Sequence, residues 1–217
     1  MSMDHQRPVL VVNAGGVSRR MGRNKALLPV PPHNEPLILS IARRLAPVTD
    51  GVILVANDVA VQKALAPVHP RCFQDVYPDA GPLGGLATAL AHVETWCLCV
   101  ACDLPFVNPQ VAAYLWSLAA EEEGARWDVV APHVHGRPQP LHALYHRRCL
   151  PVIQAHLAGG RRRVDAFFPD VRVRVVTEAE LTPLDPELRS FFNANEPADW
   201  AWALDQLKGE GRGTTRI

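Results

Sequence analysis

One feature of the sequence most constrains the fold of this chain. It is a short apolar segment that is followed directly by a glycine pair and a group of cationic residues. Residues 9–13 (VLVVN) are mostly apolar and β-branched, which predicts a buried strand. Gly15 and Gly16 follow, and their missing Cβ atoms let the backbone approach a ligand closely. The loop continues with polar and cationic side chains, namely Ser18, Arg19, Arg20, Arg23 and Lys25. Backbone N–H groups and cations in this arrangement predict a phosphate-binding loop.

Two well-known phosphate loops do not fit this segment. A Walker loop ends in Gly-Lys-Ser/Thr, and that ending is missing here. A dinucleotide fingerprint needs Gly-x-Gly-x-x-Gly, which Gly15, Gly16 and Gly22 do not form. The loop therefore argues against both a P-loop NTPase and an NAD-dependent dehydrogenase.

Composition narrows the class of protein further. With 217 residues, 48% of them hydrophobic, the chain can bury one substantial core. Its formal net charge of zero argues against a nucleic-acid-binding protein, which would carry a strongly basic surface. No apolar stretch approaches the roughly 20 residues that span a bilayer, and residues 1–7 are polar. We therefore expect a cytoplasmic protein with no nucleic-acid or membrane partner.

Strand-like and helix-like segments alternate along the chain. The expected strands are 8–13, 51–56, 71–74, 96–102, 127–132 and 171–176, and the expected helices are 37–46, 58–66, 83–93, 109–122, 146–158 and 197–208. This alternation predicts an α/β fold with a mainly parallel sheet covered on both faces. Residues 136–145 break the rhythm and are expected to form a strand that crosses over the site, antiparallel to the others. We predict a single domain over residues 1–208 and a disordered, Gly-rich tail over 209–217.

Three of the five cysteines, Cys97, Cys99 and Cys102, raise the question of a metal cluster. They lie in an expected buried strand, where a free cysteine behaves as a small apolar residue. No further Cys or His with clear zinc spacing lies nearby. We therefore expect buried thiols rather than metal ligands.

An acidic side chain ends that same expected strand. Asp103 is followed by Leu104 and Pro105, and proline stops the strand. Because ligands bind beyond the carboxyl ends of parallel strands, Asp103 and the glycine loop are expected to converge. A carboxylate beside a phosphate site is suited to Mg²⁺; the alternative is that Asp103 caps the following helix.

The glycine loop resembles the signature of the molybdenum cofactor guanylyltransferases (MobA), Leu-Ala-Gly-Gly-x-Ser-x-Arg-Met-Gly-x-Asp-Lys. The matching residues are Ala14, Gly15, Gly16, Ser18, Arg20, Met21, Gly22 and Lys25. Asn13 replaces the usual Leu, and Asn24 replaces the usual Asp. Further segments resemble the family in the same order, namely Cys102–Pro105, Gly81–Gly85, Pro140–Tyr145 and Phe191–Asp199.

This resemblance implies a Rossmann-like, three-layer α/β/α domain of the nucleotide-diphospho-sugar transferase type. It implies transfer of GMP from GTP to the phosphate of molybdopterin with release of pyrophosphate, with Mg²⁺ held by Asp103. Catalytic roles are implied for Lys25, Arg20 and Asp103. The implied nucleotide-binding residues are Asn13, Ala14, Gly15, Gly16, Ser18, Lys25, Asn57, Asp75, Gly81 and Asp103.

The acceptor side is implied by the later segments of the resemblance. The candidate acceptor-binding residues are Arg137, His142, Asn193 and Asn195. His142 could equally be a structural histidine. The pair Asn57 and Asp58 could instead cap one helix, and Asn195 could cap the last helix. Arg161–Arg163 could be a solvated helix start or reach the pterin phosphate. The resemblance also implies transient contact with molybdopterin-handling proteins. A monomer or weak homo-oligomer is expected.

Two alternative functions stay open at this point. The first lies in the same class: a cytidylyltransferase for the same pterin, or another sugar-phosphate or small-molecule nucleotidyltransferase. The second is a nucleotide-binding adaptor that has lost catalysis, against which the presence of Lys25 and Asp103 argues.

Overall fold

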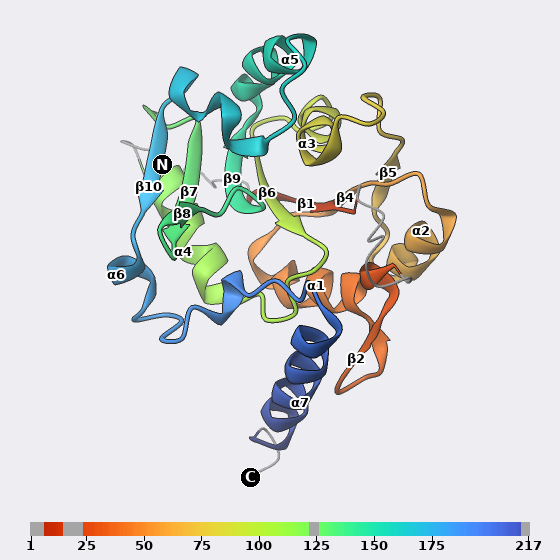
Figure 1. The fold of residues 1–217 in the computed structure, drawn as a ribbon. Coiled ribbons are helices and arrows are strands. Elements are labelled where there is room, and N and C mark those ends of the chain that lie inside the picture. Colours follow the sequence, from red (N-terminus) through yellow and green to blue (C-terminus); the bar gives the residue numbers. More distant parts are fainter. Residues whose placement is uncertain (1–6, 15–23, 122–125, 214–217) are drawn as a thin grey trace, which may run out of the picture.

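A mixed, mostly parallel sheet forms the centre of the molecule (Figure 1). We describe a computed structural model, which covers residues 7–14, 24–121 and 126–213. In these residues the sheet runs in the order β10 (Val173–Val176), β7 (Val129–Val134), β9 (His142–His146), β6 (Trp96–Ala101), β1 (Val9–Asn13), β4 (Val52–Val55) and β5 (Arg71–Phe73), and β8 (Arg137–Pro138) pairs with β7. Along that order only β9 runs antiparallel to its neighbours.

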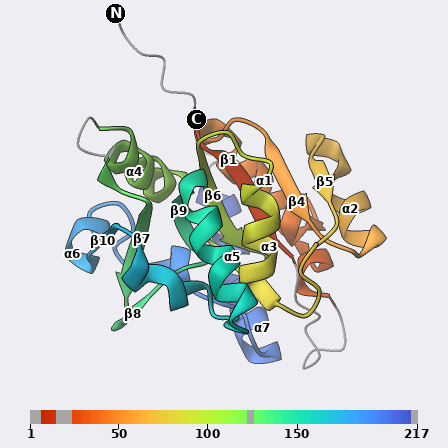
Figure 2. The same cartoon turned by 90° about the horizontal axis from the view of Figure 1, so that it is seen from above.

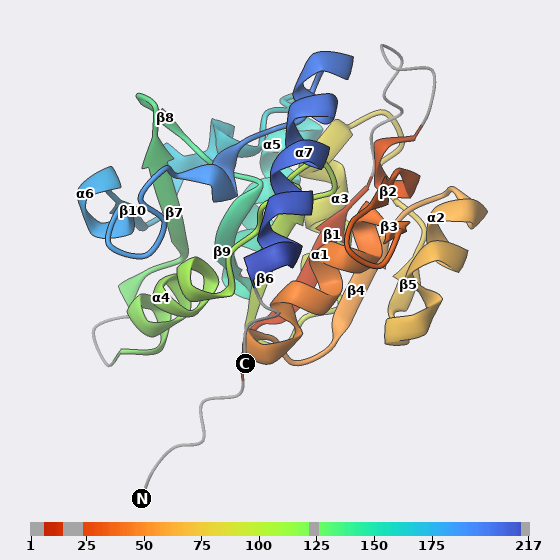
Figure 3. The same ribbon diagram turned by 90° about the horizontal axis from the view of Figure 1, so that it is seen from below.

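Helices cover both faces of the sheet (Figure 2). One face packs against α3 (Gly81–Leu90) and α5 (Leu150–Ala158), and the other packs against α1 (Leu37–Leu45), α2 (Val59–Leu65) and α4 (Pro109–Ala120). The helix α7 (Pro197–Gly213) also lies on the second face, where Ala203 and Leu207 are buried (Figure 3). The α/β fold with a mainly parallel sheet is thereby confirmed.

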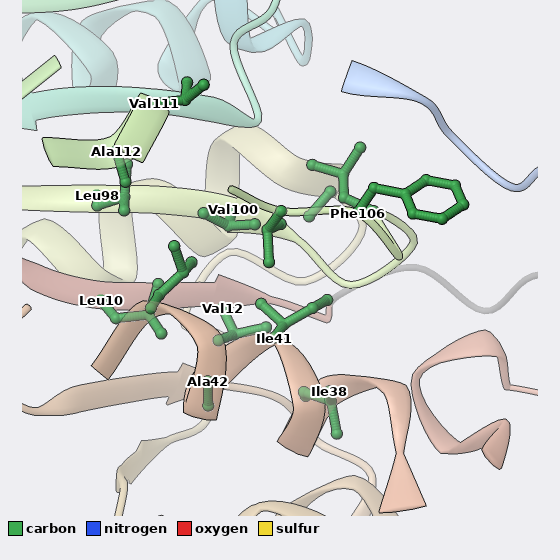
Figure 4. Packing of buried hydrophobic residues seen from close by; sticks show 14 of the residues in the cluster. Leu10, Val12, Ile38, Ile41, Ala42, Leu98, Val100, Phe106, Val111 and Ala112 are labelled. Carbon is green, nitrogen blue, oxygen red and sulfur yellow. The ribbon is translucent and has the colours of Figure 1, made fainter. Parts of the chain in front are cut away.

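The two central strands show why this sheet is buried on both sides. Leu10 and Val12 of β1 point into the core shared with α1, whereas Val11 points to the face of α3. Successive side chains of a strand point to opposite faces, so an unbroken apolar run is typical of a strand covered on both sides. In Figure 4, Ile38, Ile41 and Ala42 of α1 lie beside Leu10 and Val12 in this packing.

The expected strands are all present, and the expected antiparallel strand in residues 136–145 is confirmed as β9, with β8 before it. Helix boundaries differ more. The helix expected at 146–158 begins at Leu150, because His146 still belongs to β9, paired with Trp96. The helix expected at 83–93 runs from Gly81 to Leu90.

A hairpin and a single-turn helix of the described residues were not expected from the sequence. The hairpin of β2 (Pro29–Val30) and β3 (Glu35–Pro36) contains too few residues for a periodic pattern. The single-turn helix α6 (Glu178–Leu181) is set by a capping box, in which the side chains and backbone groups of Thr177 and Glu180 bond reciprocally.

The predicted start of the disordered tail at residue 209 is wrong. Helix α7 continues to Gly213, so residues 209–213 are helical, and residues 214–217 lie outside the described residues. Glycine costs about 1 kcal/mol in a helix relative to alanine but does not end one. The glycines at 209, 211 and 213 were therefore a poor signal for disorder.

Across the described ranges, the structure has no helix that is long and apolar enough to cross a membrane.

Candidate active site

Lys25, Asp103 and Asn195 meet beyond the carboxyl ends of β1 and β6. Lys25 Nζ lies 3.1 Å from Asn195 Oδ1 and donates a hydrogen bond to it. The same Nζ lies 3.9 Å from Asp103 Oδ2. Because β1 and β6 are parallel neighbours, the segments that follow them emerge at the same edge of the sheet. The predicted convergence of the glycine-loop lysine with Asp103 is therefore present.

Asn24 caps the short helix that begins with Lys25. In this 3₁₀ helix, η1 (Lys25–Leu27), Asn24 Oδ1 accepts the Ala26 N–H at 3.1 Å. Its Nδ2 donates to Asp58 at 3.1 Å. Asn and Asp are about equally good N-caps, so the replacement of the family's usual Asp leaves this capping role intact.

Asp103 is a partly buried carboxylate beside a buried cation. Burial raises the pKa of Asp103, and the charge of Lys25 opposes that rise. The side chain of Asp103 is 25% exposed, whereas that of Lys25 is 9% exposed. The Asp103 carbonyl accepts the Ala194 N–H at 3.1 Å, which fixes the segment before α7 against this strand end. Asp103 therefore keeps an accessible side for a ligand.

Asn195 does not cap α7 with its side chain. The caps come from Asp199, whose Oδ2 accepts the N–H groups of Asn195 at 2.9 Å and Glu196 at 2.8 Å. This leaves the Asn195 amide to accept the bond from Lys25. The alternative that Asn195 is a helix cap is thus contradicted.

A pocket of about 380 Å³ adjoins this cluster. It contains all four predicted acceptor-binding residues, Arg137, His142, Asn193 and Asn195. Arg163 also lines it and forms an ion pair with Asp165 at 2.8 Å. Of the three consecutive arginines, Arg161 and Arg162 instead line a separate pocket of about 390 Å³ beside Tyr77.

His142 is neutral in this pocket wall. Burial lowers the pKa of His142 to about 4, although its bond to Ser190 and the charge of Asp185 oppose the fall. Its Nδ1 lies 3.2 Å from the Ser190 carbonyl, so Nδ1 carries the proton and donates it. Nε2 is then an acceptor, and it is buried with no hydrogen-bond partner among the described residues.

The protonation of His142 predicts a pH-dependent stability. The pKa in the unfolded chain is 6.5 and in the folded protein about 4, so the unfolded chain binds the extra proton between these values. Stability therefore falls as pH drops from 6.5 to 4, by about 3 kcal/mol at about 1.4 kcal/mol per pKa unit. Urea unfolding across this range should show a smaller loss for His142→Phe than for the wild type. The exposed His133→Ala variant should keep the wild-type loss, and an equal loss in His142→Phe would contradict the assignment.

On the nucleotide side, Asn13 connects the end of β1 to the start of α3. Its Nδ2 donates to the Pro82 carbonyl at 2.9 Å. A Cβ atom on Gly85 would lie 3.1 Å from Asn13 Nδ2, so this helix position needs to stay small. Ala14 follows Asn13 and packs partly buried against the core. Gly81 begins α3 with φ +64°, a conformation that favours glycine.

The structure brings together Asn57 and Asp75, two of the predicted nucleotide-binding residues. Asn57 Oδ1 accepts the Asp75 N–H at 3.3 Å. The N-cap of α2 is the neighbouring Asp58, whose Oδ1 accepts the Ala60 N–H at 2.8 Å. Asn57 therefore bonds the loop that carries Asp75. Of the pair Asn57 and Asp58, it is Asp58 that caps α2, so the alternative of a helix cap is confirmed at Asp58.

Four predicted site residues, Gly15, Gly16, Ser18 and Arg20, lie outside the described residues. The cysteines of β6 are placed: Cys97 and Cys99 face α3 and α5, whereas Cys102 packs against the opposite core. Burial raises the pKa of both Cys99 and Cys102 to about 12, so these thiols stay protonated. Within residues 7–14, 24–121 and 126–213, no group of three or more His, Cys, Asp or Glu side chains is arranged for a metal.

Sequence reasoning missed two residues that shape the site. Asp185 accepts the N–H groups of Arg189 and Ser190, which holds the turn that presents the Ser190 carbonyl to His142. Thr88, near the end of α3, donates to Asp75. Asp185 lies four residues before Arg189, a spacing that could have suggested a turn, but Thr88 sits in an apolar helix with no local signal.

Comparisons with known proteins agree with this geometry. The sequence profile of the MobA-like NTP transferase domain matches residues 10–175. A probable molybdenum cofactor guanylyltransferase from Pelotomaculum thermopropionicum is 36% identical over 208 residues, covering 95% of this chain and 96% of that protein. The molybdenum cofactor guanylyltransferase of Vibrio cholerae is 31% identical over 195 residues, covering 88% of each.

A solved structure shows the same fold. The crystal structure of molybdopterin-guanine dinucleotide biosynthesis protein A from Archaeoglobus fulgidus superposes with a TM-score of 0.79 at 27% identity, covering 93% of this chain and 99% of that one. The profile spans most of the chain, and the relatives align along nearly all of it. The chain therefore belongs to the molybdenum cofactor guanylyltransferase family, within the MobA-like NTP transferases.

Proposed function

We propose that this protein transfers GMP from GTP to the phosphate of molybdopterin and releases pyrophosphate. The observation that carries the proposal is the meeting of Lys25 with Asp103 at the edge of the sheet, next to the pocket that contains Arg137, His142 and the two asparagines. A buried cation beside a reachable carboxylate is suited to phosphoryl transfer, in which catalysis is mostly positioning and charge neutralisation. The names of the relatives support guanylyl transfer in particular.

The reaction needs no side-chain nucleophile. An oxygen of the acceptor phosphate, already ionised, attacks the α-phosphorus of GTP in line. The bond between the α-phosphorus and the bridging oxygen breaks, and the electron pair leaves with pyrophosphate. Lys25, with Arg20 from the same loop, neutralises the charge that grows on this leaving group. Backbone N–H groups of Ala14–Gly16 hold the phosphates.

Asp103 fits a magnesium ion. Mg²⁺ typically binds one or two carboxylates and completes its shell with waters and substrate phosphates, and Asp103 offers one partly exposed carboxylate. Burial raises the pKa of Asp103, and a cation at its open side would stabilise the ionised form. When bound, Mg²⁺ supplies positive charge to the α-phosphate oxygens.

The chemistry of the side chains supports the assignment of residues to the guanine base and to the molybdopterin acceptor. Asp75, held next to Asn57, is a carboxylate that can accept the N–H groups of guanine. On the other side, Arg137 matches the geometry of a phosphate, and His142 lies in the wall of the same pocket. We further propose that the enzyme works in the cytoplasm, where its five free cysteines stay reduced, and that its product passes to molybdopterin-handling proteins.

A turnover assay tests the function. The protein is incubated with molybdopterin, Mg²⁺ and GTP, CTP or ATP in separate reactions, and pyrophosphate and the dinucleotide mass are measured. We expect product with GTP in large excess over the other two. Product with CTP instead would make the protein a cytidylyltransferase. Tight GTP binding without pyrophosphate release would make it an adaptor that has lost catalysis.

A further inference from the structure

The carboxylate of Asp75 is held on one side by two donors. Its Oδ1 accepts the Tyr77 N–H at 2.9 Å and the Thr88 hydroxyl at 3.1 Å. A carboxylate oxygen has about two acceptor sites, so these donors fill Oδ1. Among the described residues, no hydrogen bond reaches the second oxygen, Oδ2. The half-buried Asp75 thus has one oxygen engaged and one available.

Thr88 is the side chain that fixes this arrangement. It is only 1% exposed and lies near the end of α3, distant in sequence from the loop that it holds. Its Oγ1 also accepts the Val76 N–H at 3.2 Å. Because the Val76 N–H can only donate, the hydroxyl proton of Thr88 is directed to Asp75. Threonine in a helix often donates to a carbonyl of the preceding turn, but here the proton serves a loop outside the helix.

Close packing holds the loop and helix together around this bond. A Cβ atom on Gly84 would lie 2.9 Å from the Cβ atoms of both Tyr77 and Ala80. The loop from Asp75 to Ala80 is therefore pressed against the helix that carries Thr88. Rotation of the Asp75 carboxylate would break the bond to Thr88 and leave a buried hydroxyl without its acceptor, which is costly.

We propose that Thr88 is a positioning residue for base selection. By engaging Oδ1, it directs Oδ2 of Asp75 toward the exocyclic amine of guanine, and so favours guanine over a purine that lacks this amine. The proposal rests on the proposed function, in which Asp75 contacts the base. It assigns selectivity to a buried hydroxyl that does not itself touch the nucleotide.

Binding of GTP and of inosine triphosphate, which lacks the exocyclic amine, tests the proposal without needing the acceptor. Isothermal titration with Mg²⁺ gives the two Kd values and their ratio for each variant. We expect Thr88→Val to lower the preference for GTP about tenfold, because it keeps the side-chain shape but removes the hydroxyl. Thr88→Ser, which keeps the hydroxyl, should stay within about threefold of the wild type. Tenfold corresponds to about 1.4 kcal/mol of binding free energy.

Two controls separate the possible failures. Asp75→Asn should remove most of the preference; if it keeps the wild-type ratio, Asp75 does not read the base and that part of the proposed function fails. If Asp75→Asn removes the preference but Thr88→Val keeps it, the role of Thr88 is overturned. General loss of structure lowers both affinities and leaves the ratio unchanged. Thr88→Ala, which is smaller, provides the same test if the valine variant does not fold.

Discussion

We expect Asp103→Ala to reduce the rate of pyrophosphate release by at least about 1,000-fold. Asp103 is the one carboxylate within reach of Lys25 Nζ in the described residues, and it is the proposed ligand for Mg²⁺. Losing a metal ion that stabilises transition-state charge removes several kcal/mol, and a tenfold rate change corresponds to about 1.4 kcal/mol. Single-turnover assays at saturating GTP and Mg²⁺ measure this loss directly.

Asp103→Asn is the matched control for shape. It keeps the size of the side chain and the backbone bond to Ala194, so the fold should be unchanged by circular dichroism. The amide is a much weaker Mg²⁺ ligand than a carboxylate, so turnover should stay low while millimolar Mn²⁺ restores little of it. Turnover within tenfold of the wild type in either variant would remove Asp103 from the mechanism.

Lys25→Ala is expected to lower turnover by at least about 100-fold. Lys25 is buried next to Asp103, so the variant removes a positive charge that the fold holds in place. Removing one preorganised charge-stabilising group typically costs 100- to 1,000-fold in rate. The variant also removes the charge that opposes the raised pKa of Asp103, so the carboxylate protonates more readily. Steady-state assays should therefore show a lower kcat and a pH profile shifted to higher pH.

Lys63→Ala provides the comparison, because Lys63 is an exposed lysine of α2 away from the cluster. It should keep the wild-type rate and pH profile. A Lys25→Ala enzyme with the same kcat as Lys63→Ala would show that the lysine is only structural. A reduced kcat with an unchanged pH profile would show that Lys25 neutralises charge without influencing the pKa of Asp103.

The central strands β1 and β6 were predictable because each is a continuous apolar run that the sheet buries on both faces. Helix ends were less predictable where no side chain caps them, as at the start of α3, whereas α4 begins where expected, after its cap Asn108. The start of α5 was predicted too early, because His146 pairs with Trp96 and belongs to β9. Local periodicity gives no information about this pairing.

The site was predictable where the resemblance supplied residues, and less so where contacts join distant segments. The resemblance named Lys25, Asp103 and four candidate acceptor-binding residues, and the structure places Lys25 beside Asp103 and the other four in one adjoining pocket. The bond from Lys25 to Asn195 spans 170 residues, and its geometry depends on Asp199 taking over the capping of α7. Thr88 could not be found from local pattern, because its partner Asp75 lies 13 residues away across a turn.

The contact between Lys25 and Asn195 also determines how early the site can form while the ribosome synthesises the chain. The ribosome delivers residue 25 long before residue 195, while β1, β4 and β6 can already pair behind it. Only a chain synthesised as far as residue 195 can form this bond, and the backbone bond from Ala194 to Asp103 becomes possible at almost the same point. The cluster is therefore completed late in synthesis.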